Sequence, residues 1–275
     1  LGADAQRHYN DYVGRLGALL TGGQHVCDVA VLYPVRTLWA HFVPPLEPIK
    51  SWVGRDTRSP WETEVPVNYG AVVKELLCNQ IDVDIIDETA LIQANIQHGA
   101  VQINNETYRV IVCPVMDALS LAAAQAMAKF VESGGWVISV GDLPELGESE
   151  ASTPRVRVLM AALFGENGEG HRTSLEGLVE TIRECLPDSV KLRTPNSNVL
   201  VTHRFLEGRH VYFLANNQSE PIVLQPDMGG SGPYTLYRPL TGDVTVLSMK
   251  VALDVVLDAF EGVFLVSKPA DRTDT

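Results

Sequence analysis

The segment from Tyr108 to Pro144 constrains the fold more than any other part of this chain. Its sequence predicts a buried strand (RVIVCP), a helix from Ser120 to Glu132, a stop at Gly134-Gly135 and a second apolar strand (WVISVGDLP). Two apolar strands joined by a helix form a β-α-β crossover, which builds a parallel sheet with its chemistry at the strand ends. The residues at those ends are Cys113, Pro114, Asp117, Gly141 and Asp142. They complete no catalytic set.

Other segments extend this α/β pattern. We expect helices over residues 3–20, 67–79, 88–94, 120–132, 156–164 and 174–186, strands over 28–33 and 83–86, and a hairpin over 100–108 that turns at Asn104-Asn105. From Val190 onward the pattern changes to short alternating segments separated by turns. We therefore predict a parallel-sheet α/β domain over residues 1–190 and a β-rich, sandwich-like domain over residues 191–275.

Composition limits the partners. The 34 acidic and 21 basic residues give a net charge of −13, which disfavours nucleic acid and anionic membrane surfaces. The apolar runs are shorter than the roughly 20 residues that a membrane span needs, so we expect neither nucleic acid nor a membrane as partner. The sequence opens at Leu1. We interpret it as a fragment and assign no compartment.

Residues that could hold a metal or act as nucleophiles are scattered. Cys27, Cys78, Cys113 and Cys185 form no CxxC pair and are expected to be buried free thiols. The histidines His25, His98, His171, His203 and His210 lack the spacing of a zinc site. The acidic cluster Asp82, Asp84, Asp87 and Glu88 fits a strand and a helix N-cap better than a catalytic pair. We predict no metal and no cofactor.

The stretch from Val35 to Val65 is the main candidate for a binding site, because a loop of this length at a strand end is usually functional. Its aromatic rings could stack on sugar faces, with nearby polar groups binding hydroxyls. Alternatively, the rings pack against another domain, and we favour this interpretation. The candidate residues, in the loop or just before it, are Tyr33, Arg36, Trp39, His41, Trp52 and Trp61.

The order of several phrases resembles a known family. These are RLGALLTGGQHVCDVAVLYPVRTLWAHF, IDVDIIDETAL, GAVQINNETYRVIVCPVMDALS, FVESGGWVISVGDLPE, RHVYFLANNQSEP and YRPLTGDV. Together they resemble the region after the catalytic barrel in large bacterial glycoside hydrolases of the α-L-rhamnosidase type. The resemblance implies a flavodoxin-like, class I glutamine-amidotransferase-like domain, akin to the trimerisation domain of β-galactosidases, followed by a β-sandwich.

In such enzymes the catalytic carboxylates lie on an upstream (β/α)8 barrel. The likeness to amidotransferases concerns architecture only, because Cys113 is followed by Pro114 and lacks the flanking glycines of their nucleophile turn. We therefore predict a non-catalytic accessory region that supports the barrel, oligomerisation or glycan binding, with the upstream barrel, a glycan and a second copy of the chain as expected partners. The alternatives are a self-contained thiol hydrolase that uses Cys113, and a purely structural oligomerisation module.

Overall fold

The computed structural model describes residues 2–42, 60–187, 190–228, 233–247 and 253–269, with the backbone alone for residues 60–63. The chain divides into two compact units. Residues Asp28–Glu75 and Val83–Cys185 form the parallel-sheet unit, and residues Leu1–Cys27, Leu76–Asp82 and Leu186–Thr275 form the antiparallel unit. The two units therefore differ from the consecutive ranges 1–190 and 191–275 that the sequence predicts. The helix and short strand that open the chain belong with the C-terminal strands, because they pack and pair there.

The parallel-sheet unit is built on five parallel strands in the order β3-β2-β7-β8-β9. All residues of β2 and β7 are buried, as their continuous apolar sequences predict for strands that are covered on both faces. The predicted crossover is confirmed, and so are the two earlier strands. The sequence HRT of β9 carries no apolar signal, and this strand was missed. The bounds are β2 (Val29–Leu32), β3 (Asp84–Ile86), β7 (Val110–Cys113), β8 (Trp136–Val140) and β9 (His171–Thr173).

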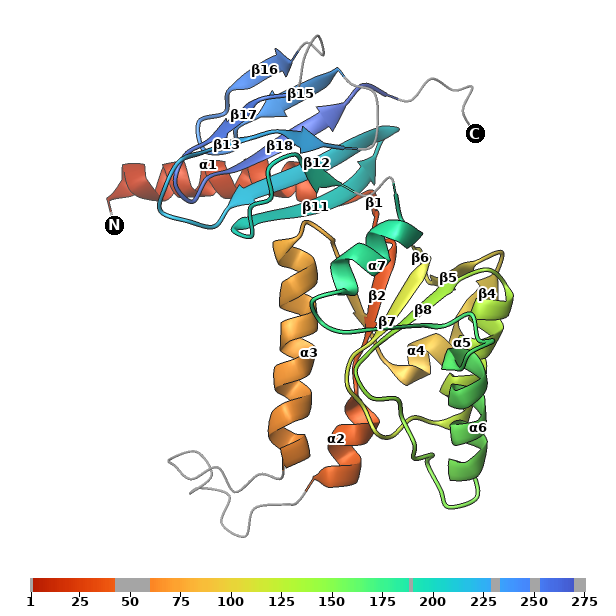
Figure 1. The fold of residues 1–275 in the computed structure, drawn as a ribbon. Coiled ribbons are helices and arrows are strands. Elements are labelled where there is room, and N and C mark those ends of the chain that lie inside the picture. The colour runs from red at the N-terminus through yellow and green to blue at the C-terminus, as the bar shows by residue number, and fades with distance from the viewer. Residues whose placement is uncertain (1, 43–59, 188–189, 229–232, 248–252, 270–275) are drawn as a thin grey trace, which may run out of the picture. The chain divides into compact units, whose positions relative to one another are not determined.

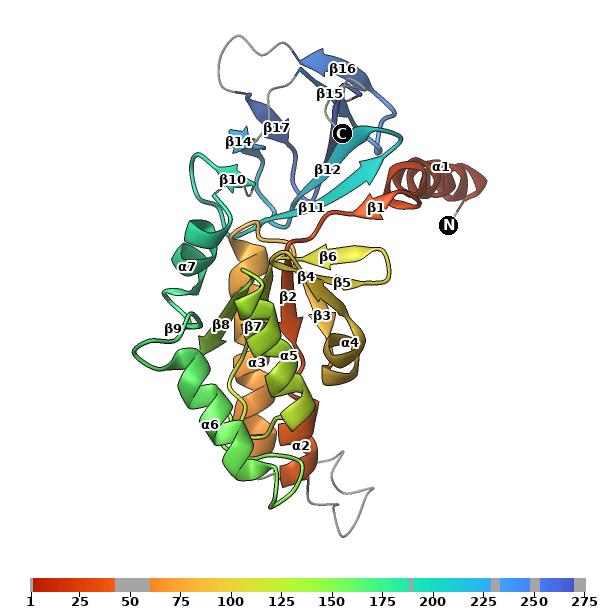
Figure 2. The same cartoon turned by 90° about the vertical axis from the view of Figure 1, so that its right-hand side faces the viewer.

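Helices cover both faces of this sheet: Figure 2 shows α5 in front of the strands and α3 behind them. Helix α5 begins after the N-cap Ser120, whose hydroxyl accepts a hydrogen bond from the Ala123 N–H, and it ends before Gly134, where φ is +94°. It packs against α4 and α6. The bounds are α2 (Val35–His41), α3 (Pro60–Cys78), α4 (Glu88–Gln93), α5 (Leu121–Glu132), α6 (Thr153–Phe164) and α7 (Leu178–Cys185).

The loop predicted over residues 35–65 is wrong at both ends. Helix α2 begins at Val35, directly after β2, and α3 begins at Pro60 rather than near residue 67. Pro66 lies inside α3, where a proline normally weakens the helical pattern. The sequence therefore placed the start of this helix too late.

A small antiparallel sheet follows α4 in the same unit. It consists of β4 (Asn95–Gln97), β5 (Ala100–Ile103) and β6 (Glu106–Tyr108). The hairpin between β5 and β6 turns at Asn104-Asn105, as predicted, and Asn104 takes a positive φ of +54°. Asparagine tolerates this left-handed conformation better than most residues.

The antiparallel unit is a six-stranded sheet with a smaller second layer, seen in Figure 1 among the blue and teal strands. Its main core lies on one face of the sheet and includes Val201, Tyr212, Leu214 and Leu265. Helix α1 (Ala3–Leu20) lies on the other face, where its leucines pack against Val211, Phe264 and Val266. The main sheet contains β1 (Gln24–His25), β11 (Val199–Leu206), β12 (Arg209–Asn216), β18 (Gly262–Ser267), β15 (Tyr234–Tyr237) and β16 (Val244–Leu247). The second layer contains the pairs β13 (Ile222–Leu224) with β17 (Val255–Leu257), and β10 (Lys191–Leu192) with β14 (Pro226–Asp227).

The fold class is thus mixed α/β, with one parallel sheet and separate antiparallel sheets. Among the helices of the described residues, none is long and apolar enough to cross a bilayer.

Candidate functional site

The carboxyl ends of β2 and β7 are where a ligand is expected in this kind of sheet. The two strands are adjacent and parallel. The strand that follows β2 in the parallel sheet, β3, lies on one side of it, whereas β7, β8 and β9 continue on the other side. The strand order therefore reverses between β2 and β7, and open α/β sheets bind ligands in the crevice at such a reversal. We call this place the switch crevice.

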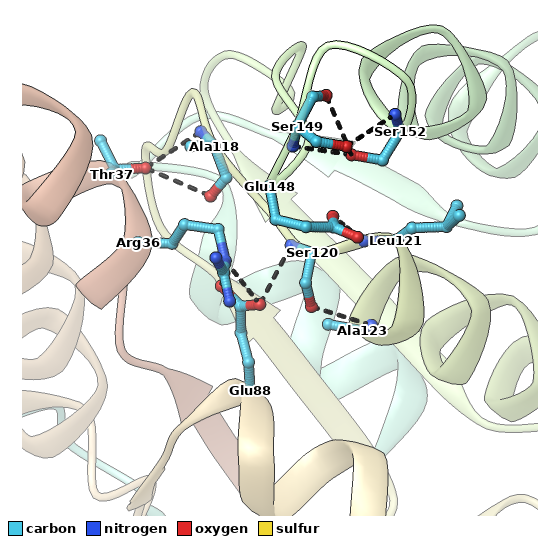
Figure 3. A network of polar contacts seen from close by, with 10 residues as sticks. All are labelled: Arg36, Thr37, Glu88, Ala118, Ser120, Leu121, Ala123, Glu148, Ser149 and Ser152. Carbon is cyan, nitrogen blue, oxygen red and sulfur yellow. Dashed lines mark hydrogen bonds and ion pairs between the residues drawn. The ribbon is translucent and has the colours of Figure 1, made fainter.

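A buried carboxylate occupies the switch crevice. The side chain of Glu88, the first residue of α4, is only 8% exposed. Its two oxygens lie 3.2 and 3.1 Å from the Arg36 Nε, and Oε2 also accepts the Ser120 backbone N–H at 3.0 Å. Figure 3 shows Glu88 between the guanidinium of Arg36 and the start of α5. The sequence had assigned Glu88 to a helix start without this pairing, whereas the expected N-cap role holds for Asp87, which accepts the Ala90 N–H at 2.7 Å.

The N-terminus of α5 binds a second carboxylate of the same chain. Glu148 Oε2 accepts the Leu121 backbone N–H at 2.9 Å, and this hydrogen bond is the main reason why the pKa of Glu148 lies below its usual value. A helix N-terminus attracts anions because its first N–H groups lack partners within the helix. Here Glu88 and Glu148 bind two N–H groups, those of Ser120 and Leu121, that could otherwise bind an external phosphate or carboxylate.

The loop between β7 and α5 is held in the same way (Figure 3). The Thr37 hydroxyl accepts the N–H groups of Asp117 and Ala118, each at 3.1 Å, and donates to the Ala118 carbonyl at 3.4 Å. Asn68 Oδ1 accepts the Val115 N–H at 2.9 Å. Backbone donors that could cradle a ligand are thus bound to side chains of α2 and α3.

His41 and Asp117 form the outer part of this network. His41 Nε2 contacts Asp117 Oδ2, and both side chains are mostly shielded from solvent. The other carboxylate oxygen of Asp117 is buried and has no hydrogen-bond partner in the described part of the chain. The pair fixes the end of α2 to the β7–α5 loop.

The structure separates the six residues that the sequence proposed as one binding loop. Arg36 and His41 join the internal network, whereas the Trp39 side chain on α2 is 69% exposed. Tyr33 is 37% exposed. Trp61 lies in α3 with only its backbone described, and Trp52 lies outside the described residues.

Sequence reasoning missed the partners that close the crevice, namely Thr37, Asn68 and Glu148. Each is a single polar residue in a helix or polar segment, and no spacing signal distinguishes it.

Cys113 does not have the environment of a nucleophile. It is 4% exposed, and its Sγ lies 4.0 Å from the Met127 Sδ of α5. Burial raises the pKa of the thiol to about 12, and no cationic group offsets this effect. The expectation of a buried structural thiol is confirmed. Cys27 and Cys185 are buried as well, Cys78 is partly exposed, and none of the four cysteines forms a disulfide.

Two histidines that looked unrelated in the sequence meet in the antiparallel unit. His203 on β11 and His210 on β12 share a hydrogen bond of 2.9 Å between Nε2 and Nδ1, and the His203 ring stacks on Tyr212 with centroids 4.1 Å apart. Burial, with a smaller contribution from His210, lowers the pKa of His203 to about 3. These histidines are therefore neutral at ordinary pH.

The antiparallel unit also has a cavity of about 520 Å³ beside α1. Its floor is formed by apolar residues such as Leu19, Val211 and Phe264. Two arginines in its lining are already engaged: Arg15 donates to the Pro239 carbonyl at 3.0 Å, and Arg238 pairs with Glu261 at 2.5 Å. Nothing in this lining singles out a ligand.

Comparisons with known proteins show which solved structures have a similar fold. No family model matches the sequence, and no curated protein does. Among solved structures, the chain is similar to the β-galactosidase from Bacillus circulans sp. alkalophilus, with a TM-score of 0.60 and 16% identity over 94% of this chain and 44% of that one. The cold-adapted β-galactosidase from Rahnella sp. R3 gives a TM-score of 0.57 and 12% identity, over 94% of this chain and 44% of that one.

A catalytic mutant of Gan42B, a GH42 β-galactosidase from G. stearothermophilus, gives a TM-score of 0.56 and 12% identity over 92% of this chain and 42% of that one. At these identities the similarity establishes the fold alone. The chain has a fold that is also found in GH42 β-galactosidases, and it spans less than half the length of each of these three proteins.

Proposed function

We propose that this chain is a non-catalytic accessory region of a multidomain glycoside hydrolase. The observation that carries the proposal is the closed switch crevice, where the chain's own carboxylates and hydroxyls bind the N–H groups that would receive a ligand. The length comparison supports the proposal as well, because more than half of each β-galactosidase named above has no counterpart in this chain.

We further propose that the parallel-sheet unit is flavodoxin-like. Numbered along the chain, its strands follow the spatial order 2-1-3-4-5, which is the order of flavodoxin. Flavodoxin binds its cofactor at the switch between its first and third strands. In this chain the corresponding crevice holds Glu88 and Arg36. This supports a domain that has the flavodoxin-like fold but does not bind the cofactor.

The class of parent enzyme rests on two separate observations. The order of sequence phrases supports an α-L-rhamnosidase-like parent, whereas the three solved structures described above are β-galactosidases. Both are glycoside hydrolases, and we propose the parent at the level of that class.

The exposed aromatic residues of α2 favour a domain interface. Trp39 is 69% exposed and Phe42, at the end of the helix, is 61% exposed. Two neighbouring large apolar side chains in water are typical of a surface that another domain covers. We propose that this surface packs against the catalytic barrel of the parent enzyme, and that a glycan or a second copy of the chain is a further partner.

The environment of Cys113 argues against a thiol hydrolase. A thiol that is buried and has a pKa of about 12 supplies almost no thiolate at neutral pH.

The test of the proposed accessory role is hydrolysis of 4-nitrophenyl β-D-galactoside and α-L-rhamnoside by the purified chain. We expect no turnover above buffer, and turnover that is lost in a Cys113→Ala or Glu88→Gln variant would contradict the proposal.

A further inference from the structure

A second pocket, of about 610 Å³, lies in the parallel-sheet unit at the outer edge of the sheet. We call it the edge pocket. Strand β3 is the terminal strand there, and the β5–β6 hairpin forms the opposite wall. The lining residues are Tyr33, Ile85, Ile86, Asp87, Ala90, Ile103, Asn104, Asn105, Glu106 and Tyr108.

One residue of the edge pocket carries a hydrogen-bond acceptor that the described part of the chain does not use. Glu106 Oε2 is buried and has no hydrogen-bond partner among the described residues. Asp87, which is exposed, caps α4 through Oδ1. A buried acceptor without a donor costs free energy, and that cost is recovered when a ligand supplies the donor. Side-chain amides that can both donate and accept are present on Asn104 and Asn105.

One wall of the edge pocket is aromatic. The Tyr33 ring is 37% exposed, and Tyr69 holds it edge-to-face at a centroid distance of 5.2 Å and an angle of 84°. Tyr108 is 4% exposed and donates its hydroxyl to Asp84 at 3.1 Å. Because packing already orders the Tyr33 ring, a ligand that stacks on it pays little for immobilising it.

The charges of the edge pocket limit the chemical class of ligand that it can bind. Among the residues that the structure describes, its lining includes the carboxylates of Asp87 and Glu106 and no lysine or arginine. Phosphates, nucleotides and acidic peptides would be repelled. Hydroxyl groups suit the pocket, since they donate to carboxylates and exchange hydrogen bonds with amides, while the apolar face of a sugar ring suits tyrosine.

We propose that the edge pocket binds a neutral saccharide of one or two rings. The volume lies within the usual range for small-ligand sites, roughly 300 to 1,000 Å³. The choice of a saccharide rests in part on the proposed function, whereas the position of the site rests on the lining residues alone. This site differs from the loop that the sequence suggested. Of the six residues proposed there, only Tyr33 also lines the edge pocket.

The test is titration of the purified chain with galactose, lactose, L-rhamnose and cellobiose, followed by saturation-transfer NMR and calorimetry. We expect at least one of these sugars to bind. Tyr33→Ala should weaken its binding about fivefold or more, since it removes the stacking ring. Glu106→Gln should weaken the binding of that sugar about threefold or more. The substitution keeps the shape of the side chain, but it removes the negative charge and replaces one acceptor oxygen with an amide donor.

Two further variants sharpen the test. Asn104→Gly keeps a residue that tolerates the positive φ while it removes the amide, and it should weaken binding. Tyr9→Ala is the matched control, because Tyr9 is a tyrosine on α1 that is 63% exposed and lies outside the pocket, and this variant should bind like the unmodified chain.

Three results would overturn the inference: no binding of any of the four sugars, equal affinity of the Tyr33→Ala and Tyr9→Ala variants, or salt-sensitive binding of spermidine that is tighter than that of every sugar. Spermidine tests whether the pocket is only a site for cations, whose binding salt would screen. Failure here is distinct from failure of the accessory role, which would appear as hydrolysis by the chain.

Discussion

Replacing Glu88 by alanine should destabilise the parallel-sheet unit strongly. The change leaves the Arg36 guanidinium without its carboxylate and the Ser120 N–H without its acceptor. Breaking a buried ion pair from one side costs about 3 to 5 kcal/mol, and a buried N–H without an acceptor costs about 1 to 3 kcal/mol. Because the Arg36 side chain is 32% exposed, water compensates part of this loss. We therefore expect a decrease of about 2 to 4 kcal/mol in the free energy of unfolding.

The Glu88→Gln variant separates charge from hydrogen bonding. Its amide oxygen still accepts the Ser120 N–H while the negative charge is lost, so the decrease should be about half as large. The assay is urea denaturation followed by circular dichroism, together with amide hydrogen exchange at Ser120 and Leu121, which reports on this unit directly.

Glu145→Ala is the control for this experiment. The Glu145 side chain is 72% exposed and lies 3.7 Å from Arg157, so its loss should change stability by less than about 0.5 kcal/mol. If Glu88→Ala costs no more than Glu145→Ala, the carboxylate does not close the switch crevice, and the reasoning is refuted.

Three other predictions follow from single residues. Cys113 in the native chain should react with iodoacetamide at least tenfold more slowly than in urea, because the thiol is buried; equal rates would contradict this. His203 stays neutral in the folded chain, whereas in the unfolded chain it binds a proton near pH 6.5. The free energy of unfolding should therefore fall as the pH drops from 6.5 toward 3, by up to about 1.4 kcal/mol per pH unit. This fall should be smaller in the His203→Gln variant. Gly135→Ala should cost about 1 to 3 kcal/mol, since its Cβ would lie 1.9 Å from the buried Phe130 ring, whereas Gly70→Ala in α3 meets no atom within 4 Å and should be neutral or stabilising in thermal melts.

The sequence predicted the parallel sheet well because its central strands are continuous apolar runs. Val29–Leu32 and Val110–Cys113 are buried on both faces, so their composition indicates their place. The edge strand His171–Thr173 consists of three polar residues with no apolar alternation, so it could be found only from its pairing with β8. Helix α2 was missed because aromatic residues and nearby prolines are typical of loops.

The candidate site was predictable only in part, because its contacts join distant segments. Arg36 and Glu88 are 52 residues apart, and Glu148 lies 27 residues from Leu121. A single sequence indicates which residues are polar, but not which of them meet at a strand end. The pairing of His203 with His210 was not predicted either, although the two lie on neighbouring strands of one hairpin.

The central claim is that catalysis belongs to another part of the parent protein, and reading the gene that encodes this chain tests it most directly. We predict a neighbouring segment of about 250 residues that forms a (β/α)8 barrel with two carboxylates at its strand ends. A gene that encodes a free-standing protein of about the 30.0 kDa of this chain would contradict the account.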